Sequence, residues 1–247
     1  MDERVRSQVF GEDAATYDGT RPSYPEAVID IVVADAPVTA IDVGCGTGKA
    51  ALRVAARDVD VLGIEPDERM AEVARRHGIE VIVSQFEDWP AHPCDLVFSA
   101  QAWHWIDPVR GAAKAAEVLS PGARWAAFWN RETDERLHDT LARTYAQFAP
   151  GLLEARSPSG FERGVGDTEA GFDSVGGFEP LERHQIAWTD TIDVATLVAR
   201  LSTSSSHRLL DRDVAARLHH AIADDLTGHG DHLELAYTTT LLTAARR

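Results

Sequence analysis

Short apolar runs alternate with amphipathic segments from about residue 23 onward. The runs are rich in β-branched residues and stop at glycine or polar residues, which is typical of buried strands. The segments between them carry helix start and stop signals. We predict strands at residues 38–44, 59–65, 79–84, 94–100, 124–129, 182–188 and 232–245. We predict helices at about 25–35, 48–58, 67–78, 107–119, 132–149, 193–202 and 211–226.

Local signals refine several of these boundaries. "SYPE" predicts a capping box, with Ser23 as N-cap and Glu26 three residues later. Asp107 followed by Pro108 predicts another helix start. "SPGA", ahead of the fifth strand, predicts a turn, and residues 150–179, with seven glycines and two prolines, predict a long loop region.

Strands that alternate with helices predict an α/β fold with a doubly wound, mostly parallel sheet. We expect seven strands in a Rossmann-like sheet, helices on both faces, an inserted helical or loop cap after strand five, and a closing antiparallel pair. The second half does not suggest a separate domain, so we expect one domain over residues 1–247. In such sheets ligands bind at the carboxyl ends of the strands.

Composition narrows the classes of partner. The 247-residue chain has a net charge of −16 and no dense Lys/Arg cluster, which argues against nucleic-acid binding. A small-molecule substrate fits better, and cationic or neutral ones stay open. Two cysteines make no disulfide framework, so a reducing cytoplasm is expected. The N-terminal sequence lacks a secretory h-region and no run is long enough for a membrane span, so no membrane association is expected; the oligomeric state is unknown.

The most informative stretch is "IDVGCGTGKA", in which Gly44, Gly46 and Gly48 follow strand one and open a helix. Glycines allow a tight turn and close approach of the backbone to a ligand. Strand two ends about twenty residues later in Glu65, where an acid accepts hydrogen bonds from ribose hydroxyls. This combination favours a nucleoside-type cofactor over an ordinary glycine-rich turn.

The glycine spacing separates cofactor classes. It is G-x-G-x-G, whereas dinucleotide sites use G-x-G-x-x-G, and the phosphate-loop pattern is absent. Asp42, just before the turn, adds negative charge where a phosphate would be disfavoured. A cofactor with a cationic centre and an amino-acid tail therefore fits better than a nicotinamide dinucleotide. Asp42 as a simple turn cap is the alternative.

At this point the sequence resembles the class I S-adenosylmethionine-dependent methyltransferases, and most closely their small-molecule enzymes of the trans-aconitate and quinone-pathway type. The resemblance lies in "IDVGCGTG", "GIEPD", "CDLVFSAQAWHWID" and "VLSPGARWAAFWN", with "FGEDAATYDGTRPSYP" similar to the family's N-terminal cap segment. It covers about residues 10–130 and implies S-adenosyl-L-methionine as cofactor. One departure is "SPGAR", where the family usually has a second glycine.

The resemblance implies a division of the chain into functional segments. Residues 1–35 would form the N-terminal cap segment and 36–130 the cofactor-binding half. Residues 131–180 would be a substrate-side insertion, followed by closing strands and helices over 181–247.

The resemblance also implies site residues. The expected cofactor-binding set is Tyr17, Arg21, Asp42, Gly44, Cys45, Gly46, Gly48, Glu65, Pro66, Gln85, Phe86, Ala100 and Gln101. Within it, Asp42 would lie below the methionine moiety, Glu65 would bind the ribose and Pro66 would pack near the adenine. Gln85 would meet the adenine N6, although the family often has an acid there. No metal is expected.

Tyr17 and Arg21 have two readings, since the N-terminal arm could simply pack, or could also close over the cofactor carboxylate. Cys45 is expected to be a small turn residue, because methyl transfer requires no covalent enzyme intermediate. The late histidines, among them His207 and His219, lack a convincing metal-ligand spacing and favour a solvated face.

The segment "SAQAWHWID" places His104 between two tryptophans directly after strand four. His104 is the candidate catalytic base or substrate hydrogen-bond donor. If the chain stays extended, Trp103 and Trp105 face opposite sides. We expect Trp105 to pack inward, and His104 with Trp103 to line the substrate pocket.

Three functions follow in order of preference. The first is a methyltransferase that transfers a methyl group from S-adenosylmethionine to a small-molecule carboxylate, hydroxyl or activated carbon by in-line displacement. The second is a non-catalytic, regulatory S-adenosylmethionine-binding protein of the same fold. The third is a nicotinamide oxidoreductase, against which the glycine spacing argues.

Overall fold

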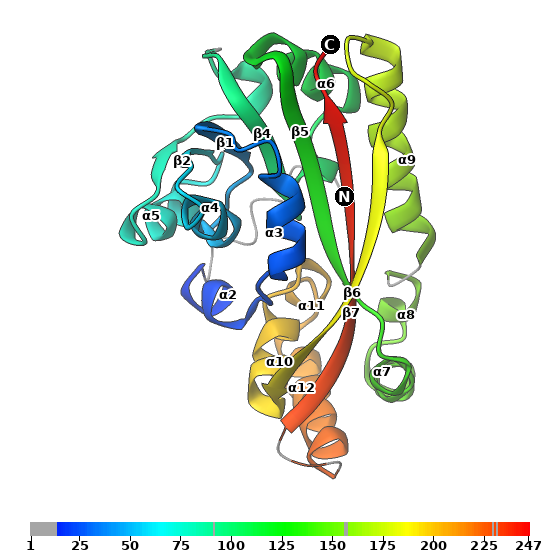
Figure 1. The fold of residues 1–247 in the computed structure, drawn as a ribbon. Helices are drawn as coiled ribbons and strands as arrows, with labels where there is room; N and C mark the ends of the chain where they lie inside the picture. The colour runs from blue at the N-terminus through cyan, green and yellow to red at the C-terminus, as the bar shows by residue number, and fades with distance from the viewer. Residues whose placement is uncertain (1–13, 91, 156–157, 229, 231) are drawn as a thin grey trace. The chain divides into compact units, whose positions relative to one another are not determined.

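The computed structural model describes residues 14–90, 92–155, 158–228, 230 and 232–247, and Figure 1 traces its helices and strands. The first 13 residues of the predicted N-terminal cap segment lie outside this range. The strands are β1 Thr39–Val43, β2 Asp60–Ile64, β3 Glu80–Ile82, β4 Cys94–Ala100, β5 Leu119–Glu132, β6 Glu182–Asp193 and β7 His232–Ala245. The helices are α2 Ala14–Thr20, α3 Glu26–Val32, α4 Lys49–Ala55, α5 Glu68–Arg76, α6 Pro108–Val118, α7 Glu135–Phe148, α8 Gly151–Ala155, α9 Pro158–Val175, α10 Val194–Ser202, α11 Ser205–Arg208 and α12 Arg212–Thr227, with short 3₁₀ helices η2 Phe86–Asp88 and η3 Trp103–Trp105.

The strands form one seven-stranded sheet in the order β3-β2-β1-β4-β5-β7-β6. Strands β1 to β5 pair in parallel, with Asp42 opposite Gly63 on one side and Phe98 on the other. Strand β7 is antiparallel to β5. The Gly122 amide, near the start of β5, donates to the Arg246 carbonyl, whereas the Thr133 amide, just after β5, donates to the earlier residue Ala236. This confirms the predicted doubly wound α/β sheet. Its order reverses between β1 and β4, the switch point at which such sheets bind ligands.

The described residues cluster into two compact units. One is built from the described parts of segments 1–22, 131–161 and 187–238, and the other from 23–130, 162–186 and 239–247. A single domain over the whole chain stays a prediction. In the described part of the chain, no helix combines the length and apolar character that a membrane crossing requires.

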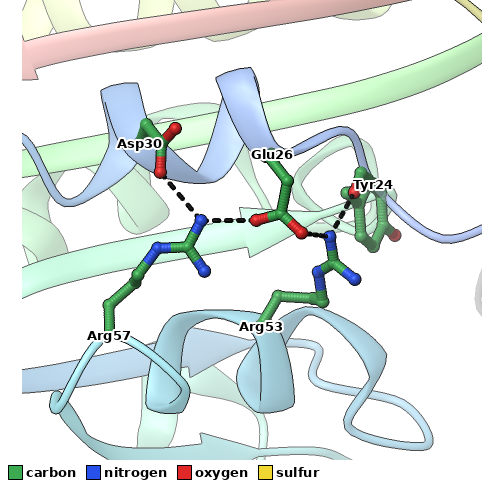
Figure 2. Close-up of polar contacts among 5 residues, drawn as sticks. All are labelled: Tyr24, Glu26, Asp30, Arg53 and Arg57. Atoms are coloured by element: carbon green, nitrogen blue, oxygen red, sulfur yellow. Dashed lines mark hydrogen bonds and ion pairs between the residues drawn. The ribbon is translucent and has the colours of Figure 1, made fainter.

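The second unit carries the parallel strands, and its core is fully buried. Leu96 and Phe98 of β4 and Val54 of α4 each have 0% exposure. An ion-pair cluster joins α3 to α4: Figure 2 shows Glu26 between Arg53 and Arg57, and Arg57 also reaches Asp30 at 2.8 Å. Hydrogen bonding to Arg57 holds the pKa of Glu26 below its ordinary value. The two carboxylates are exposed and the two arginines are partly exposed, so the ion pairs contribute little to the stability of the fold.

The first unit has its own core, in which Leu141 of α7 packs with Leu218 and Ile222 of α12. A buried arginine organises the polar part of this unit. Arg200 of α10 donates from Nε to the Thr20 carbonyl at 2.7 Å and from Nη2 to Asp190 at 3.2 Å. It also bonds the Tyr237 hydroxyl. The guanidinium thus ties the end of α2 to α10 and β7.

Two predicted boundary signals differ from the structure. Helix α3 begins after Pro25, whose extended backbone is the N-cap position, and no side chain caps it. Ser23 is therefore not a capping residue, and its carbonyl instead accepts a hydrogen bond from Asn130 at 2.9 Å. The "SPGA" segment is an irregularity within β5, where the pairing with β4 jumps from Leu119 to Arg124.

The predicted cap at Asp107 is confirmed, because its carboxylate accepts hydrogen bonds from the Val109 and Arg110 amides.

The predicted loop over residues 150–179 was wrong, because most of it is helical in α8 and α9. Along α9 the buried positions are Val165, Thr168, Gly171 and Phe172, a helical spacing. A Cβ at Gly171 would lie 2.3 Å from the Pro108 carbonyl oxygen. This glycine therefore reflects close packing of α9 on the start of α6, where the sequence suggested a helix breaker. The short helix α11 was also not predicted.

Replacing two glycines of α9 distinguishes a glycine required by close packing from one that only weakens the helix. Gly171→Ala should lower the free energy of unfolding by about 1–3 kcal/mol, because the new methyl group collides with backbone. Gly166 is exposed and a Cβ there meets nothing within 4 Å, so Gly166→Ala should raise it by about 0.5–1 kcal/mol. Urea unfolding of both variants measures this. Equal effects of the two substitutions would contradict the packing argument.

Candidate functional site

The turn between β1 and α4 has a backbone that favours glycine. Gly44, Gly46 and Gly48 have φ angles of 67°, 56° and 85°. These values lie in the left-handed region, which side chains with a Cβ rarely occupy. A Cβ at Gly44 would also sit 2.5 Å from the Ala102 Cβ, so the turn lies against the segment that follows β4. The structure thus brings the ends of β1 and β4 together, as predicted from the parallel order.

Glu65 joins this turn to the end of β2. Its Oε2 accepts a hydrogen bond from the Gly46 amide at 2.9 Å, and its Oε1 accepts from the Asp67 amide at 2.9 Å. The residue is only 7% exposed. Burial raises the pKa of Glu65 to about 7, against the opposing effect of the two amide donors. Each carboxylate oxygen keeps a second lone pair for a further donor.

Asp42 is the other carboxyl group of the site. It lies in β1, is 1% exposed, and its Oδ1 has no hydrogen-bond partner among the described residues. Burial raises the pKa of Asp42 well above its ordinary value, and the nearby charge of Glu65 adds to the effect. Buried polar atoms are almost always paired in folded proteins, so an unpaired acceptor next to a glycine turn indicates a ligand position.

Backbone strain marks the end of β4. Gln101 has a φ of 60° although it is not glycine, a conformation that costs about 1–2 kcal/mol. Its amide donates to the Phe128 carbonyl at 2.9 Å and its side-chain Nε2 donates to the Asn130 carbonyl at 3.0 Å. Ala100, the last residue of the strand, is half-buried. Strain of this kind is commonly kept where a site requires it.

The two tryptophans after β4 have the reverse of their expected positions. Trp103 is 1% exposed and packs edge-on against Trp125, with ring centroids 4.9 Å apart, and near Phe172 of α9. Trp105 is half-buried and stays closer to the surface. The segment is the 3₁₀ helix η3, so the alternation of an extended chain does not apply. We expected Trp105 to pack inward and Trp103 to line the pocket. This was wrong, because Trp103 is the buried one of the two.

His104 is solvent-exposed, yet the protein around its ring lowers its pKa to about 4 through desolvation. Its Nδ1 accepts a hydrogen bond from the Trp129 indole nitrogen at 3.2 Å. The Trp105 ring lies 4.6 Å away, centroid to centroid. His104 is consequently a neutral imidazole at neutral pH.

The remaining predicted cofactor contacts occupy several places. Pro66 follows Glu65 directly and is exposed, as is Gln85 after β3. Phe86 is buried, with its ring 6.0 Å from that of Trp103. Arg21 donates from Nη2 to the Thr203 hydroxyl at 3.4 Å within its own compact unit. Tyr17 lies in α2. The roles of Tyr17 and Arg21 over the cofactor stay predictions.

Cys45 is buried inside the turn, at 7% exposure. Burial first, and the charges of Asp42 and Glu65 next, raise the pKa of its thiol well above the ordinary value. A thiol that stays protonated is a poor nucleophile, so a packing role is consistent with the geometry. A Cβ at Gly63 would lie 2.6 Å from the Cys45 sulfur, so Gly63 makes room for this side chain.

Trp129 was not predicted as a site residue. One of the late histidines, His207, differs from its expected exposure, whereas His220 and His232 are exposed as expected. Trp129 closes the apolar run "RWAAFW", and its position at the end of a strand was the available signal. His207, expected on a solvated face, is 4% exposed and bonds Tyr145 at 3.0 Å and His219 at 2.9 Å. A pair of histidines twelve residues apart gives no local sign of such a contact.

These features fit a nucleoside-type cofactor. The turn offers backbone with no Cβ in the way, Glu65 offers spare acceptor capacity, and Asp42 offers an unpaired buried oxygen. All three belong to the carboxyl ends of β1 and β2.

The raised pKa of Glu65 predicts a pH-dependent stability. The folded protein binds the Glu65 proton more tightly than the unfolded chain does. Protonated Glu65 therefore adds to the free energy of unfolding below about pH 4.5, and this contribution is lost as the pH rises through about 7. In Glu65→Gln this loss should disappear. The variant should gain about 2 kcal/mol relative to wild type between about pH 5 and about pH 8.

Urea unfolding of ligand-free wild type and variant at both pH values measures this change. Glutamine also alters the hydrogen bonds of residue 65, but that cost is the same at both pH values and cancels when they are compared. Glu72→Gln, at an exposed position on α5, is the matched control and should show no such change. A wild-type stability that rises over the same window relative to Glu65→Gln would refute the assignment.

Comparisons with known proteins bear on the family. A family model described as a methyltransferase domain matches residues 40–122. An uncharacterised methyltransferase of Mycobacterium tuberculosis H37Rv is 31% identical over 214 residues, which are 82% of this chain and 79% of the relative. A malonyl-[acyl-carrier protein] O-methyltransferase of Hahella chejuensis is 32% identical over 136 residues, 50% of this chain and 49% of the relative.

Among solved structures, a candidate type II methyltransferase from Anaeromyxobacter dehalogenans superposes with a TM-score of 0.66. It is 25% identical, and the match covers 92% of this chain and 97% of the other. The long match to the mycobacterial relative, the matching family model and this shared fold agree with the geometry of the site. The chain therefore belongs to the class I S-adenosylmethionine-dependent methyltransferases.

Proposed function

We propose that this enzyme binds S-adenosylmethionine at the glycine turn and methylates a small molecule at a carboxylate, hydroxyl or activated carbon. The observation that carries the proposal is the unpaired, buried Asp42 oxygen beside a turn that Glu65 holds from the next strand. A ligand with donor groups and positive charge would compensate for both buried carboxyl groups. A nicotinamide dinucleotide would bring phosphates toward them instead.

The residues of the site have distinct tasks in this proposal. Glu65 accepts hydrogen bonds from the ribose hydroxyls, and the backbone of Gly44, Cys45, Gly46 and Gly48 borders the amino-acid tail and ribose. Asp42 lies below the methionine moiety, with Ala100 and Gln101 at its reactive end. Pro66, Gln85 and Phe86 surround the adenine.

When bound, S-adenosylmethionine would supply the electrophilic methyl group of a sulfonium for transfer to the acceptor. The task of the protein is then to align the acceptor and to exclude water. Alignment of two reactants in a site contributes roughly 7–11 kcal/mol in well-oriented systems. The strained backbone of Gln101 and the rigid aromatic packing around Trp103 support such positioning.

Two further observations bear on the acceptor. The relative from Hahella chejuensis is, by its name, a malonyl-[acyl-carrier protein] O-methyltransferase, which is consistent with an oxygen acceptor. The chain carries a net charge of −16, which disfavours a nucleic-acid substrate. The non-catalytic alternative fits less well, since the matching family model and the mycobacterial relative are both described as methyltransferases.

Calorimetry with S-adenosylmethionine, S-adenosylhomocysteine and a nicotinamide dinucleotide tests the cofactor assignment. Wild type should bind both sulfur nucleosides and not the dinucleotide. Glu65→Ala should weaken binding by more than about tenfold, because the ribose loses a charge-assisted acceptor. Glu72→Ala, on the exposed face of α5, should bind as wild type does. Absence of binding to either sulfur nucleoside would overturn the proposal.

A further inference from the structure

The contact between Trp129 and His104 restricts the chemistry of the histidine. Trp129 lies near the end of β5 and is 4% exposed, so its indole N–H requires a partner inside the protein. It finds this partner in His104 Nδ1, at 3.2 Å. An indole N–H donates only and never accepts. Nδ1 must therefore present a lone pair to Trp129.

A neutral imidazole carries one proton, on one of its two nitrogens. With a lone pair at Nδ1, the proton of His104 lies on Nε2. Protonation of Nδ1 would place two N–H groups face to face, which agrees with the lowered pKa of this histidine. Nε2 makes no hydrogen bond to another described residue. His104 thus offers a donor and has no free basic nitrogen.

Neighbouring elements lie against the pair. Helix α9 passes beside η3, where a Cβ at Gly164 would make an ordinary contact, 3.7 Å from the His104 Cβ. The ring of Trp105, the next residue, lies against the His104 imidazole with an interplanar angle of 45°. Trp103 is fixed in the aromatic core directly before it. Rotation of the imidazole would break the hydrogen bond from Trp129.

We propose that Trp129 is a positioning residue that fixes His104 as an Nε2–H donor, and that the methyl acceptor is a carboxylate which His104 orients. The proposal rests on the proposed function, and it decides among the three acceptor classes named there.

The proton balance of the reaction supports a carboxylate. A carboxylate is ionised at neutral pH, with an ordinary pKa of about 4, whereas a phenol has one of about 10. When a carboxylate oxygen is methylated, no proton has to leave, and the product is a neutral ester. A hydroxyl or carbon acid must give a proton to a base in or before the same step. An Nε2–H group cannot accept that proton, but it can hold one carboxylate oxygen while the other reacts.

The tautomer is measurable without cofactor or substrate. Two-dimensional ¹⁵N NMR of the imidazoles in ligand-free protein should show His104 with a protonated Nε2 and an unprotonated Nδ1 between about pH 5 and about pH 8. His104→Gln assigns the signals. In Trp129→Phe the two tautomers should mix, whereas Trp105→Phe, which leaves the hydrogen bond from Trp129 to His104 in place, should leave Nε2 protonated. A protonated Nδ1 in wild type would overturn the proposal.

Substitutions at His104 separate a donor from a base. Glutamine retains an N–H donor but cannot take a proton, whereas alanine has neither group. His104→Ala should lower kcat/KM by about tenfold or more, and His104→Gln should recover most of that loss, because the glutamine amide can replace the imidazole N–H as donor to the carboxylate. A loss in His104→Gln as large as in His104→Ala would show a general base. Cofactor affinity should be unchanged in both variants.

Matched acceptors test the substrate class. A labelled-methyl transfer screen should pair each small carboxylic acid with the alcohol and the amide of the same skeleton. Methyl esters should form from the acids only. With S-adenosylmethionine saturating, so that Glu65 is already engaged, kcat/KM for the acceptor should stay level from about pH 6 to about pH 8 instead of rising with pH. Methylation of the alcohols alone would overturn the carboxylate assignment and leave the proposed function intact. A failure to bind S-adenosylmethionine in calorimetry would instead remove the proposed function itself.

Discussion

The hydrogen bond from the Gly46 amide to the Glu65 carboxylate holds the site together. It connects the turn after β1 to the end of β2, two segments that the parallel sheet brings to the same edge. Because the same carboxylate also accepts from Asp67, the start of α5 is fixed with it. The glycines of the turn make this contact sterically possible, since their left-handed backbone allows the Gly46 amide to approach the carboxylate.

The same junction has a cost for the protein without ligand. Asp42 and Glu65 are both buried, and burial raises the pKa of each. A side chain selected for stability alone would be apolar at Asp42, because its Oδ1 has no partner among the described residues. The pair is therefore better explained by a ligand than by folding. The strained backbone of Gln101 at the end of β4 is likewise better explained by a ligand than by folding.

The opposite edge of the site is built from aromatic packing. Trp103, Trp125 and Phe172 form a rigid cluster between η3, β5 and α9. This cluster anchors the residue before His104, and Trp129 anchors the imidazole itself. The histidine is thereby held in one tautomer by a neighbour from another strand, while its exposed position leaves it available to a ligand. Positioning by a neutral donor and chemistry supplied by the cofactor then share the work of methyl transfer.

The sequence by itself determined the sheet, the glycine turn and the acid at the end of β2. These features are local: strand and helix periods, left-handed glycines and caps such as Asp107 depend on neighbours within a few residues. Tertiary structure alone decided that α9 is a helix, because Gly171 looks like a helix breaker until its contact with Pro108 is seen. It also decided which tryptophan is buried and that Trp129 meets His104, since the partners come from different elements. The pKa shifts of Asp42 and Glu65 likewise required the structure, because desolvation depends on all the protein packed around a group.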